Sequence, residues 1–128
     1  MFEQKPCKFC NPSPARTMIK GSLGFAAWDR HPVNPGHFLV LPHRHFSDYF
    51  EITDDERIEL WSLVSQGKEV VEKKFNPDGY NIGINVGQYA GQSIFHLHIH
   101  VIPRYKGDVE NPRGGVRAVI PTRQRYAS

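Results

Sequence analysis

Ile94-Phe95-His96-Leu97-His98-Ile99-His100-Val101-Ile102 is the stretch of sequence that decides the fold. Three histidines alternate with apolar residues, and a period of two is the pattern of a β-strand. The pattern predicts a strand over 93–102 with the histidines on one face and Leu97, Ile99 and Val101 on the other. Imidazoles titrate, donate, accept or bind metal near neutral pH, so the histidine face indicates function.

The spacing limits what the three histidines can do together. Residues two apart on a strand are separated by roughly 6.6 Å and residues four apart by roughly 13 Å. The ligands of one zinc ion lie only about 2 Å from it, so three histidines on one straight strand would be strained around a single ion. Three interpretations stay open: polar residues facing solvent, a metal site that uses two histidines, and catalysis with one histidine lent to a metal. We favour the third.

The rest of the chain predicts an α+β domain with an antiparallel sheet and one long helix on one face. Strands are expected at 23–28, 37–41 and 80–86. Thr53-Asp54-Asp55-Glu56 is a capping-box pattern that begins a helix of about 20 residues, which Asn76-Pro77-Asp78-Gly79 ends. The apolar stripe of this helix, expected to face the core or a dimer partner, consists of Ile58, Trp61, Val64, Val70, Val71 and Phe75.

The two ends of the chain predict little regular structure. Residues 1–22 contain a Pro/Ser stretch and are expected to form a loop, and the prolines and glycines beyond Pro103 indicate extended structure. The basic residues concentrate late in the chain, and they form either a solvated segment or a rim that attracts phosphates. They are Arg104, Lys106, Arg113, Arg117, Arg123 and Arg125.

Composition indicates one soluble globular domain. The chain has 128 residues, 39% hydrophobic and 23% charged, which is enough to bury a core. No apolar run approaches the ~20 residues of a membrane span, and residues 1–10 are too polar for a secretory signal. A net charge of +3 is too mild to indicate specific nucleic-acid binding. Two cysteines three apart do not make a disulfide framework, so we expect a cytoplasmic protein.

His98, the middle histidine, is the best candidate for a nucleophile. A neutral imidazole nitrogen is competent to attack phosphorus, and a backbone carbonyl bonded to one ring nitrogen would leave the other as the attacking lone pair. His100 faces the same way and can donate to a non-bridging oxygen. Gln92 and Ser93 offer an amide and a hydroxyl for developing charge, and Gly91 allows the backbone to approach a phosphate.

At these residues the chain resembles the histidine-triad family. The match includes 96–102, in which histidines alternate with hydrophobic residues, and Ala90-Gly91-Gln92-Ser93 just upstream. Asn85, seven residues before Gln92, matches too, as does Pro35-Gly36-His37-Phe38-Leu39-Val40. The resemblance covers about residues 7–104 of a single domain over 1–128, with 105–128 as a C-terminal extension. It implies about five antiparallel strands, one long helix and a short N-terminal helix or loop.

The resemblance implies a nucleotide hydrolase or transferase that acts at an α-phosphate and forms a covalent nucleotidyl intermediate on His98. Dinucleoside polyphosphates such as diadenosine tetraphosphate, or adenosine phosphoramidates, are the implied substrates, and a homodimer is the implied assembly. By the same comparison His100, Gln92 and Ser93 contact phosphate or leaving group, and His37 supports the triad. The implied substrate-binding residues are Asp29 at the ribose, Phe9 near the base, Asn85 and Gly91.

Cys7 and Cys10 form a CxxC motif with three interpretations. Thiol redox chemistry favours a helix directly after the motif, which Asn11-Pro12-Ser13-Pro14 opposes. The cysteines are otherwise inert, or they belong to a zinc site that needs two histidines from elsewhere. Resemblance to a zinc-bearing branch of the family implies a structural Zn²⁺ held by Cys7, Cys10, His45 and His96. His43 stands where relatives usually carry lysine and is a substitute for His45, because both point the same way on an extended backbone.

Two other classes of function remain open at this point. One is a nucleotide-binding regulatory or scaffolding module with little turnover. The other is a metallohydrolase whose zinc takes part in the reaction. Substitution of His98 separates the first class from an enzyme with a covalent intermediate, and dependence of activity on metal content separates the second.

Overall fold

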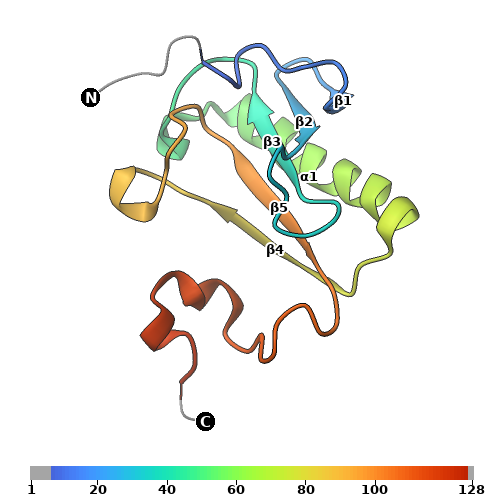
Figure 1. Ribbon diagram of the computed structural model, residues 1–128. Helices are drawn as coiled ribbons and strands as arrows, with labels where there is room; N and C mark the ends of the chain where they lie inside the picture. Colours follow the sequence, from blue (N-terminus) through green and yellow to red (C-terminus); the bar gives the residue numbers. More distant parts are fainter. Residues whose placement is uncertain (1–6, 127–128) are drawn as a thin grey trace.

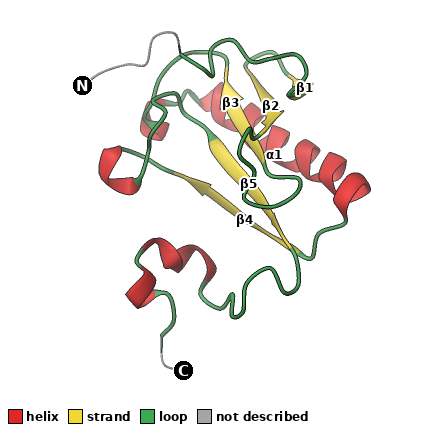
Figure 2. Cartoon of the chain, viewed as in Figure 1, coloured by secondary structure: helices red, strands yellow, loops and turns green. Residues whose placement is uncertain are grey.

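A computed structural model describes residues 7–126 of the chain (Figures 1 and 2). The first six residues of the expected N-terminal loop and the last two of the C-terminal extension lie outside this range. Within it, no helix is long and apolar enough to cross a membrane.

Five strands form one antiparallel sheet in the order β1-β2-β3-β5-β4. The expected strands are confirmed as β2 (Gly24–Trp28), β3 (Phe38–Pro42) and β4 (Gly79–Ile84). The strand with the histidines, β5 (Ile99–Arg104), begins later than expected. The prediction of a loop over 1–22 is wrong at β1 (Thr17–Lys20), a four-residue edge strand whose pairing with β2 shifts register between Thr17 and Ile19.

The long helix α1 (Asp54–Phe75) begins at the predicted capping box. The Thr53 hydroxyl accepts from the Glu56 backbone N–H at 3.1 Å, and the Glu56 carboxylate accepts from the Thr53 N–H at 2.9 Å. Both bonds satisfy donors that the first helical turn leaves without partners. The helix ends where Asn76 adopts a left-handed conformation with φ of 55°, which asparagine tolerates better than most residues.

The buried face of α1 differs from the predicted stripe. Val64 and Val71 are buried as expected, but Ile58 is 71% exposed and Trp61 and Phe75 are each 37% exposed. The residues that face the sheet are Leu60, Leu63, Val64, Gly67 and Val71. Two leucines outside the predicted stripe therefore carry much of the contact with the sheet.

The sheet has two apolar faces with different roles. Ala26, Phe38 and Val40 pack under α1 in the main core, together with Leu97, Ile99 and Val101. Their neighbours along β2 and β3 point to the opposite face, because side chains alternate along a strand. That second cluster contains Phe25, Ala27, Leu39 and Leu41, with Phe9 packed against it. The face opposite the helix is thus lined by apolar side chains and available for a site.

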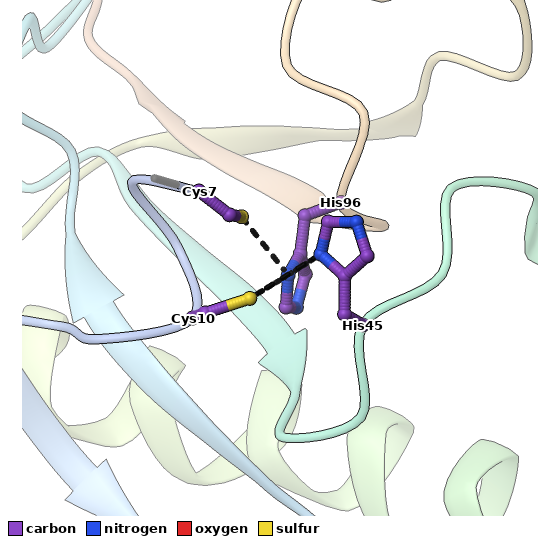
Figure 3. A group of neighbouring side chains, drawn as sticks. All are labelled: Cys7, Cys10, His45 and His96. Carbon is purple, nitrogen blue, oxygen red and sulfur yellow. Dashed lines mark hydrogen bonds between the residues drawn. The ribbon is translucent and has the colours of Figure 1, made fainter. Parts of the chain in front are cut away.

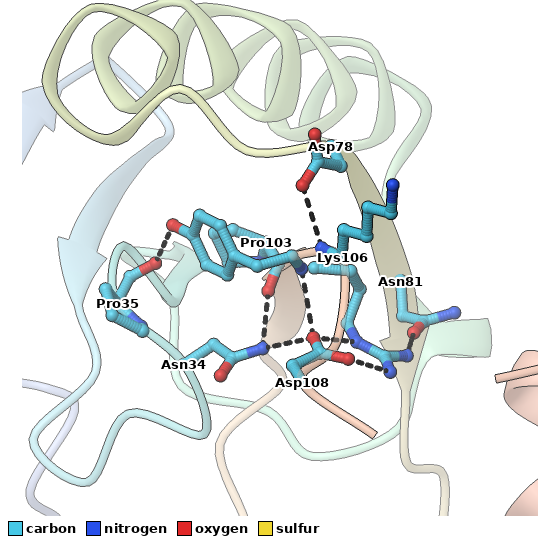
Figure 4. A network of polar contacts seen from close by, with 9 residues as sticks. Asn34, Pro35, Asp78, Asn81, Pro103, Lys106 and Asp108 are labelled. Carbon is cyan, nitrogen blue, oxygen red and sulfur yellow. Dashed lines mark hydrogen bonds and ion pairs between the residues drawn. The ribbon is translucent and has the colours of Figure 1, made fainter. Parts of the chain in front are cut away.

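The sequence predicted an extended C-terminal segment, and this prediction is wrong in part. The segment contains two short 3-10 helices, η3 (Gly115–Val119) and η4 (Pro121–Arg123). A polar network anchors the turn before them (Figure 4). Asp108 accepts two bonds of 2.8 Å from Arg104 and one of 2.8 Å from Asn34, and Arg104 also donates to Asn81 at 2.6 Å. This network connects the end of β5 to β4 and to the 29–36 loop.

Candidate active site and metal centre

The three histidines do not lie on one straight strand. The chain bends at 94–96, and β5 starts only at Ile99, because the Leu97 N–H donates to the Phe46 carbonyl at 2.6 Å instead of to a sheet neighbour. His96 contacts Cys7 of the CxxC motif, and the rings of His98 and His100 lie 4.9 Å apart farther along the chain. The predicted burial of Leu97, Ile99 and Val101 is confirmed. His96 therefore has different neighbours from His98 and His100.

The backbone fixes the protonation of His98. Its Nδ1 lies 2.8 Å from the His96 carbonyl oxygen, which only accepts, so Nδ1 carries the proton and Nε2 keeps its lone pair. Burial lowers the pKa of His98 below its ordinary value. The side chain is therefore neutral at physiological pH, with an unprotonated Nε2.

His100 is held as a hydrogen-bond donor by a chain of contacts. The Val33 backbone N–H donates to His37 Nδ1 at 3.0 Å, so the proton of His37 sits on Nε2. That atom lies 3.0 Å from His100 Nδ1 and 3.4 Å from an Asp29 carboxylate oxygen. His100 Nδ1 must then accept, which leaves the proton on His100 Nε2. Burial, with smaller effects from neighbouring histidines, lowers the pKa of His100 to about 4, so the ring is neutral.

Cys7, Cys10, His45 and His96 converge at the N-terminal side of the sheet (Figure 3). Their possible ligand atoms all lie within 4.8 Å of one another. The His96 and His45 Nδ1 atoms are 3.2 Å apart, and the sulfur–nitrogen distances are 3.3 Å for Cys10–His45, 3.5 Å for Cys7–His96 and 3.6 Å for Cys10–His96. A tetrahedral zinc ion with bonds of about 2.0 Å to nitrogen and about 2.3 Å to sulfur places its ligands roughly 3.3–3.7 Å apart.

The protonation of His96 also suits a metal. Its Nε2 lies 2.9 Å from the Pro42 carbonyl oxygen and so carries the proton, which leaves the Nδ1 lone pair facing the two sulfurs. The four residues therefore fit Zn²⁺ in number, type and spacing.

His43, the alternative ligand, lies away from the cysteines. Its ring stacks on Phe25 with centroids 5.4 Å apart, and its Nε2 donates to the Gly21 carbonyl at 2.9 Å. The chain bends directly after β3, so His43 and His45 point in different directions. The structure thus brings His45 to the cluster.

A second group with potential ligands, Asp29, His37 and His100, fits a metal poorly. Their atoms also lie within 4.8 Å of one another. The Val33 N–H, however, forces the proton of neutral His37 onto Nε2, the atom that would have to bind the ion. The group is better described as a hydrogen-bonded relay.

A cavity of about 930 Å³ opens over the apolar face opposite α1. His37, His98 and His100 line it beside Leu39 and Leu41. A cavity of this size, mostly apolar with a few convergent polar groups, is typical of a small-molecule site. The structure also brings five other predicted site residues to this cavity, namely Phe9, Asp29, Asn85, Gly91 and Ser93.

Three of these residues are placed by specific local geometry. The Phe9 ring packs edge-on against His98 with centroids 5.1 Å apart, and so covers the predicted nucleophile. Gly91 has φ of 94°, a left-handed conformation that favours glycine, at the end of the 3-10 turn η2 (Gln88–Ala90). Asp29 retains acceptor capacity toward the cavity, since Oδ1 accepts from the His31 N–H at 2.7 Å and Oδ2 faces His37.

Gln92 is not among the residues that line the cavity, and its side chain is 5% exposed. Its amide oxygen accepts from the Gly87 N–H at 2.9 Å, and its amide nitrogen donates to the carbonyls of Ser47 at 3.1 Å and Ile94 at 3.2 Å. The amide that sequence analysis assigned to phosphate is bonded to the backbone. It secures the loop that carries Gly91 and Ser93.

The cationic side chains at this cavity are not those that the sequence indicated. Lys8, Arg16 and Arg30 line it. Arg104 instead borders a separate cavity of about 500 Å³ that is lined mainly by the C-terminal segment. Arg117, within that segment, donates to the backbone carbonyls of Arg123 and Gln124. Adjacency to a predicted site residue was the only sequence signal for two of the three cavity cations, since Lys8 precedes Phe9 and Arg30 follows Asp29, and Arg16 had no such signal.

The family model of the HIT domain matches residues 11–107. The chain therefore belongs to the HIT domain family, which confirms the resemblance inferred from its histidine pattern.

Named relatives and a solved structure agree with this assignment. The chain is 44% identical over 89 residues to a bis(5'-adenosyl)-triphosphatase of Dictyostelium discoideum, covering 70% of this chain and 60% of the relative. It is 40% identical over 92 residues to an AP-4-A phosphorylase of Mycobacterium tuberculosis, covering 71% of this chain. It spans about half of that relative, 47% of its length. A Zn-bound histidine triad family protein from Mycobacterium smegmatis has a similar structure, with a TM-score of 0.68, 30% identity and coverage of 75% of this chain and 70% of that one.

Proposed function

We propose that this protein cleaves dinucleoside polyphosphates or nucleoside phosphoramidates at the α-phosphate through a covalent nucleotidyl-His98 intermediate. The observation that carries this proposal is the fixed protonation of the histidine pair. His98 presents a bare Nε2 beside a ring, His100, that presents an N–H, and both line one cavity. The relatives named as a triphosphatase and a phosphorylase support the substrate class.

In the first step His98 Nε2 attacks the α-phosphorus. The new N–P bond forms as the P–O bond to the leaving group breaks, and the leaving phosphate or nucleotide departs with the electron pair. The His98 ring becomes positively charged, and the His96 carbonyl on Nδ1–H stabilises that charge. The His100 N–H donates to an oxygen that gains charge in the transition state. Water, or another acceptor in a transfer reaction, then breaks the N–P bond and releases its proton to solvent.

The remaining cavity residues supply binding. Asp29 is proposed to accept hydrogen bonds from the ribose hydroxyls, and Phe9 to contact the base. Asn85, Ser93 and the Gly91 backbone are proposed to contact phosphate. Gln92 is proposed to position that loop through its three backbone bonds, which hold it in a buried place.

Zn²⁺ is proposed to bind Cys7, Cys10, His45 and His96 as a structural ion. When bound, it would link the N-terminal loop to the segment that precedes β5, and it would take no part in the reaction. Thiolate ligands persist in reducing compartments, so we also propose a cytoplasmic location.

We further propose a homodimer. Within residues 7–126 the sheet ends at β4, and the outer edge of such a strand favours pairing with another chain. Ile82 on this strand is 42% exposed, and Trp61 and Ile58 on α1 are exposed as well. Light scattering coupled to gel filtration tests this assembly, and a mass of one chain at micromolar concentration would refute it.

The decisive experiment is an acid quench of a reaction with diadenosine tetraphosphate, followed by intact and peptide mass measurement. We expect adenylate on the peptide that contains His98. His98→Ala and His98→Asn should abolish turnover but retain nucleotide binding, because Phe9 and the apolar floor remain. Unchanged turnover in either variant overturns the proposal and favours another nucleophile. Nucleotide binding by the wild type without turnover would favour a regulatory module, and activity that returns with added zinc would favour a metallohydrolase.

A further inference from the structure

Three cations that line the cavity have no carboxylate partner within residues 7–126. Lys8 and Arg30 are exposed and Arg16 is half-buried, and no ion pair joins any of them to another described residue. Among the described lining residues, the one carboxylate is that of Asp29, which faces His37 and the His31 N–H. With neutral histidines, three positive charges and one negative charge leave the lining at +2.

Three arginines elsewhere on the surface have side-chain or backbone partners. Arg44 forms two hydrogen bonds with Glu56, at 2.9 and 3.0 Å, and Arg104 forms two with Asp108. Arg117 donates to two backbone carbonyls of its own segment. Among residues 7–126, these three arginines have polar partners, whereas Lys8, Arg16 and Arg30 combine a place on the cavity wall with no ion pair to a described residue.

Lys8 and Arg30 each adjoin a residue that contacts a histidine of the cavity. Lys8 adjoins Phe9, whose ring touches His98, and Arg30 adjoins Asp29, which faces His37. Arg16 lies just before β1, and its carbonyl accepts from the Trp28 N–H at 2.9 Å, which fixes it beside the end of β2. The three side chains therefore come from different segments that meet at one cavity.

We infer that Lys8, Arg16 and Arg30 determine substrate preference by binding phosphate groups beyond the one that His98 attacks. This inference rests on the proposed function. A single α-phosphate in a phosphoramidate offers about one negative charge, and His100 already donates toward it. A chain of three or more phosphates offers additional charges, and flexible cations on the wall can bind them through charge-assisted hydrogen bonds. The same positive field raises the rate of encounter with polyanions, and salt screens it.

The test compares substrates that differ only beyond the α-phosphate. Lys8→Ala, Arg16→Ala and Arg30→Ala are assayed with diadenosine tetraphosphate and with adenosine 5'-phosphoramidate at low and high salt. Each variant is expected to lose about five- to tenfold in kcat/KM for the tetraphosphate, with a weaker salt dependence, and to stay within about twofold for the phosphoramidate. Lys20→Ala is the matched control, because Lys20 is an exposed cation on β1 that lines no part of this cavity.

Equal losses on both substrates, or no loss on either, would overturn the inference. A binding measurement separates it from the proposed function. In a His98→Asn background, each cation variant should weaken the binding of diadenosine tetraphosphate by about fivefold and leave AMP binding unchanged. If the wild type turns over neither substrate, the proposed function fails, and this binding comparison still decides the role of the three cations: a selective loss supports it and an equal loss refutes it.

Discussion

Replacement of Gln92 by alanine should destabilise the protein as well as impair its chemistry. The side chain is buried and forms three hydrogen bonds, to the Gly87 N–H and to the carbonyls of Ser47 and Ile94. A hydrogen bond contributes about 1 kcal/mol net, so their joint loss is expected to cost about 3 kcal/mol. For a domain of this size, this corresponds to a decrease in Tm of roughly 10 °C. Urea and thermal denaturation measure it directly, and kcat/KM should fall because the loop with Ser93 loses its anchor.

Two further variants test the positioning role of Gln92. Gln92→Glu keeps an acceptor for the Gly87 N–H but removes the amide donors and places a carboxylate against two carbonyls, so it should be at least as unstable as the alanine variant. Gln88→Ala, on the exposed surface of the same loop, should change neither stability nor activity. A Gln92→Ala protein with the wild-type Tm and an increased KM would show that the amide serves phosphate binding alone, and would refute the positioning role.

Other predictions concern packing, pH and metal. Gly67→Ala should lower the free energy of unfolding by about 1–2 kcal/mol despite the better helix propensity of alanine, because its Cβ would lie 2.4 Å from a Phe38 ring carbon. The control is Gly83→Ala, whose Cβ meets nothing within 4 Å and which should leave the free energy of unfolding nearly unchanged in urea titrations. The folded-state pKa of His100, about 4, lies below that of the unfolded chain, so the unfolded state binds more protons and stability should fall as pH decreases from about 6.5 toward 4. His100→Asn should lose less stability than wild type between pH 7 and 5, and an equal loss contradicts this. Cys10→Ser should bind little zinc by elemental analysis and should lose the chelator-induced decrease in Tm expected of wild type; full zinc retention would exclude Cys10 as a ligand.

Local patterns predicted most of the fold. The capping box located the start of α1, and alternation located β2, β3 and the buried residues of the β5 segment. The misses have physical causes. β1 is four residues long with an irregular register, so it has little periodicity to detect. The apolar stripe predicted for α1 lies partly on a different side of the helix from the buried residues, because the sequence alone does not distinguish the exposed Ile58 from the buried Leu60.

The site was predictable in its residue types but not in its hydrogen bonds. The fixed protonation of His37, His96 and His98 depends on backbone groups, and those of Val33 and Pro42 come from loops and strands whose positions only tertiary structure determines. The family resemblance implied His45, but local spacing left His43 open as a substitute, because an extended backbone was expected where the chain bends. Long-range geometry therefore decides what local spacing leaves open.

His96 connects the cysteine cluster to the cavity that contains His98. Its ring faces the cysteines, and its own carbonyl oxygen orients His98 at 2.8 Å. One residue thus contributes a ring to the proposed zinc cluster and a carbonyl to the hydrogen bond that fixes the protonation of His98. The proposed structural ion and the proposed nucleophile would therefore be separated by a single residue, although the ion lies outside the reaction.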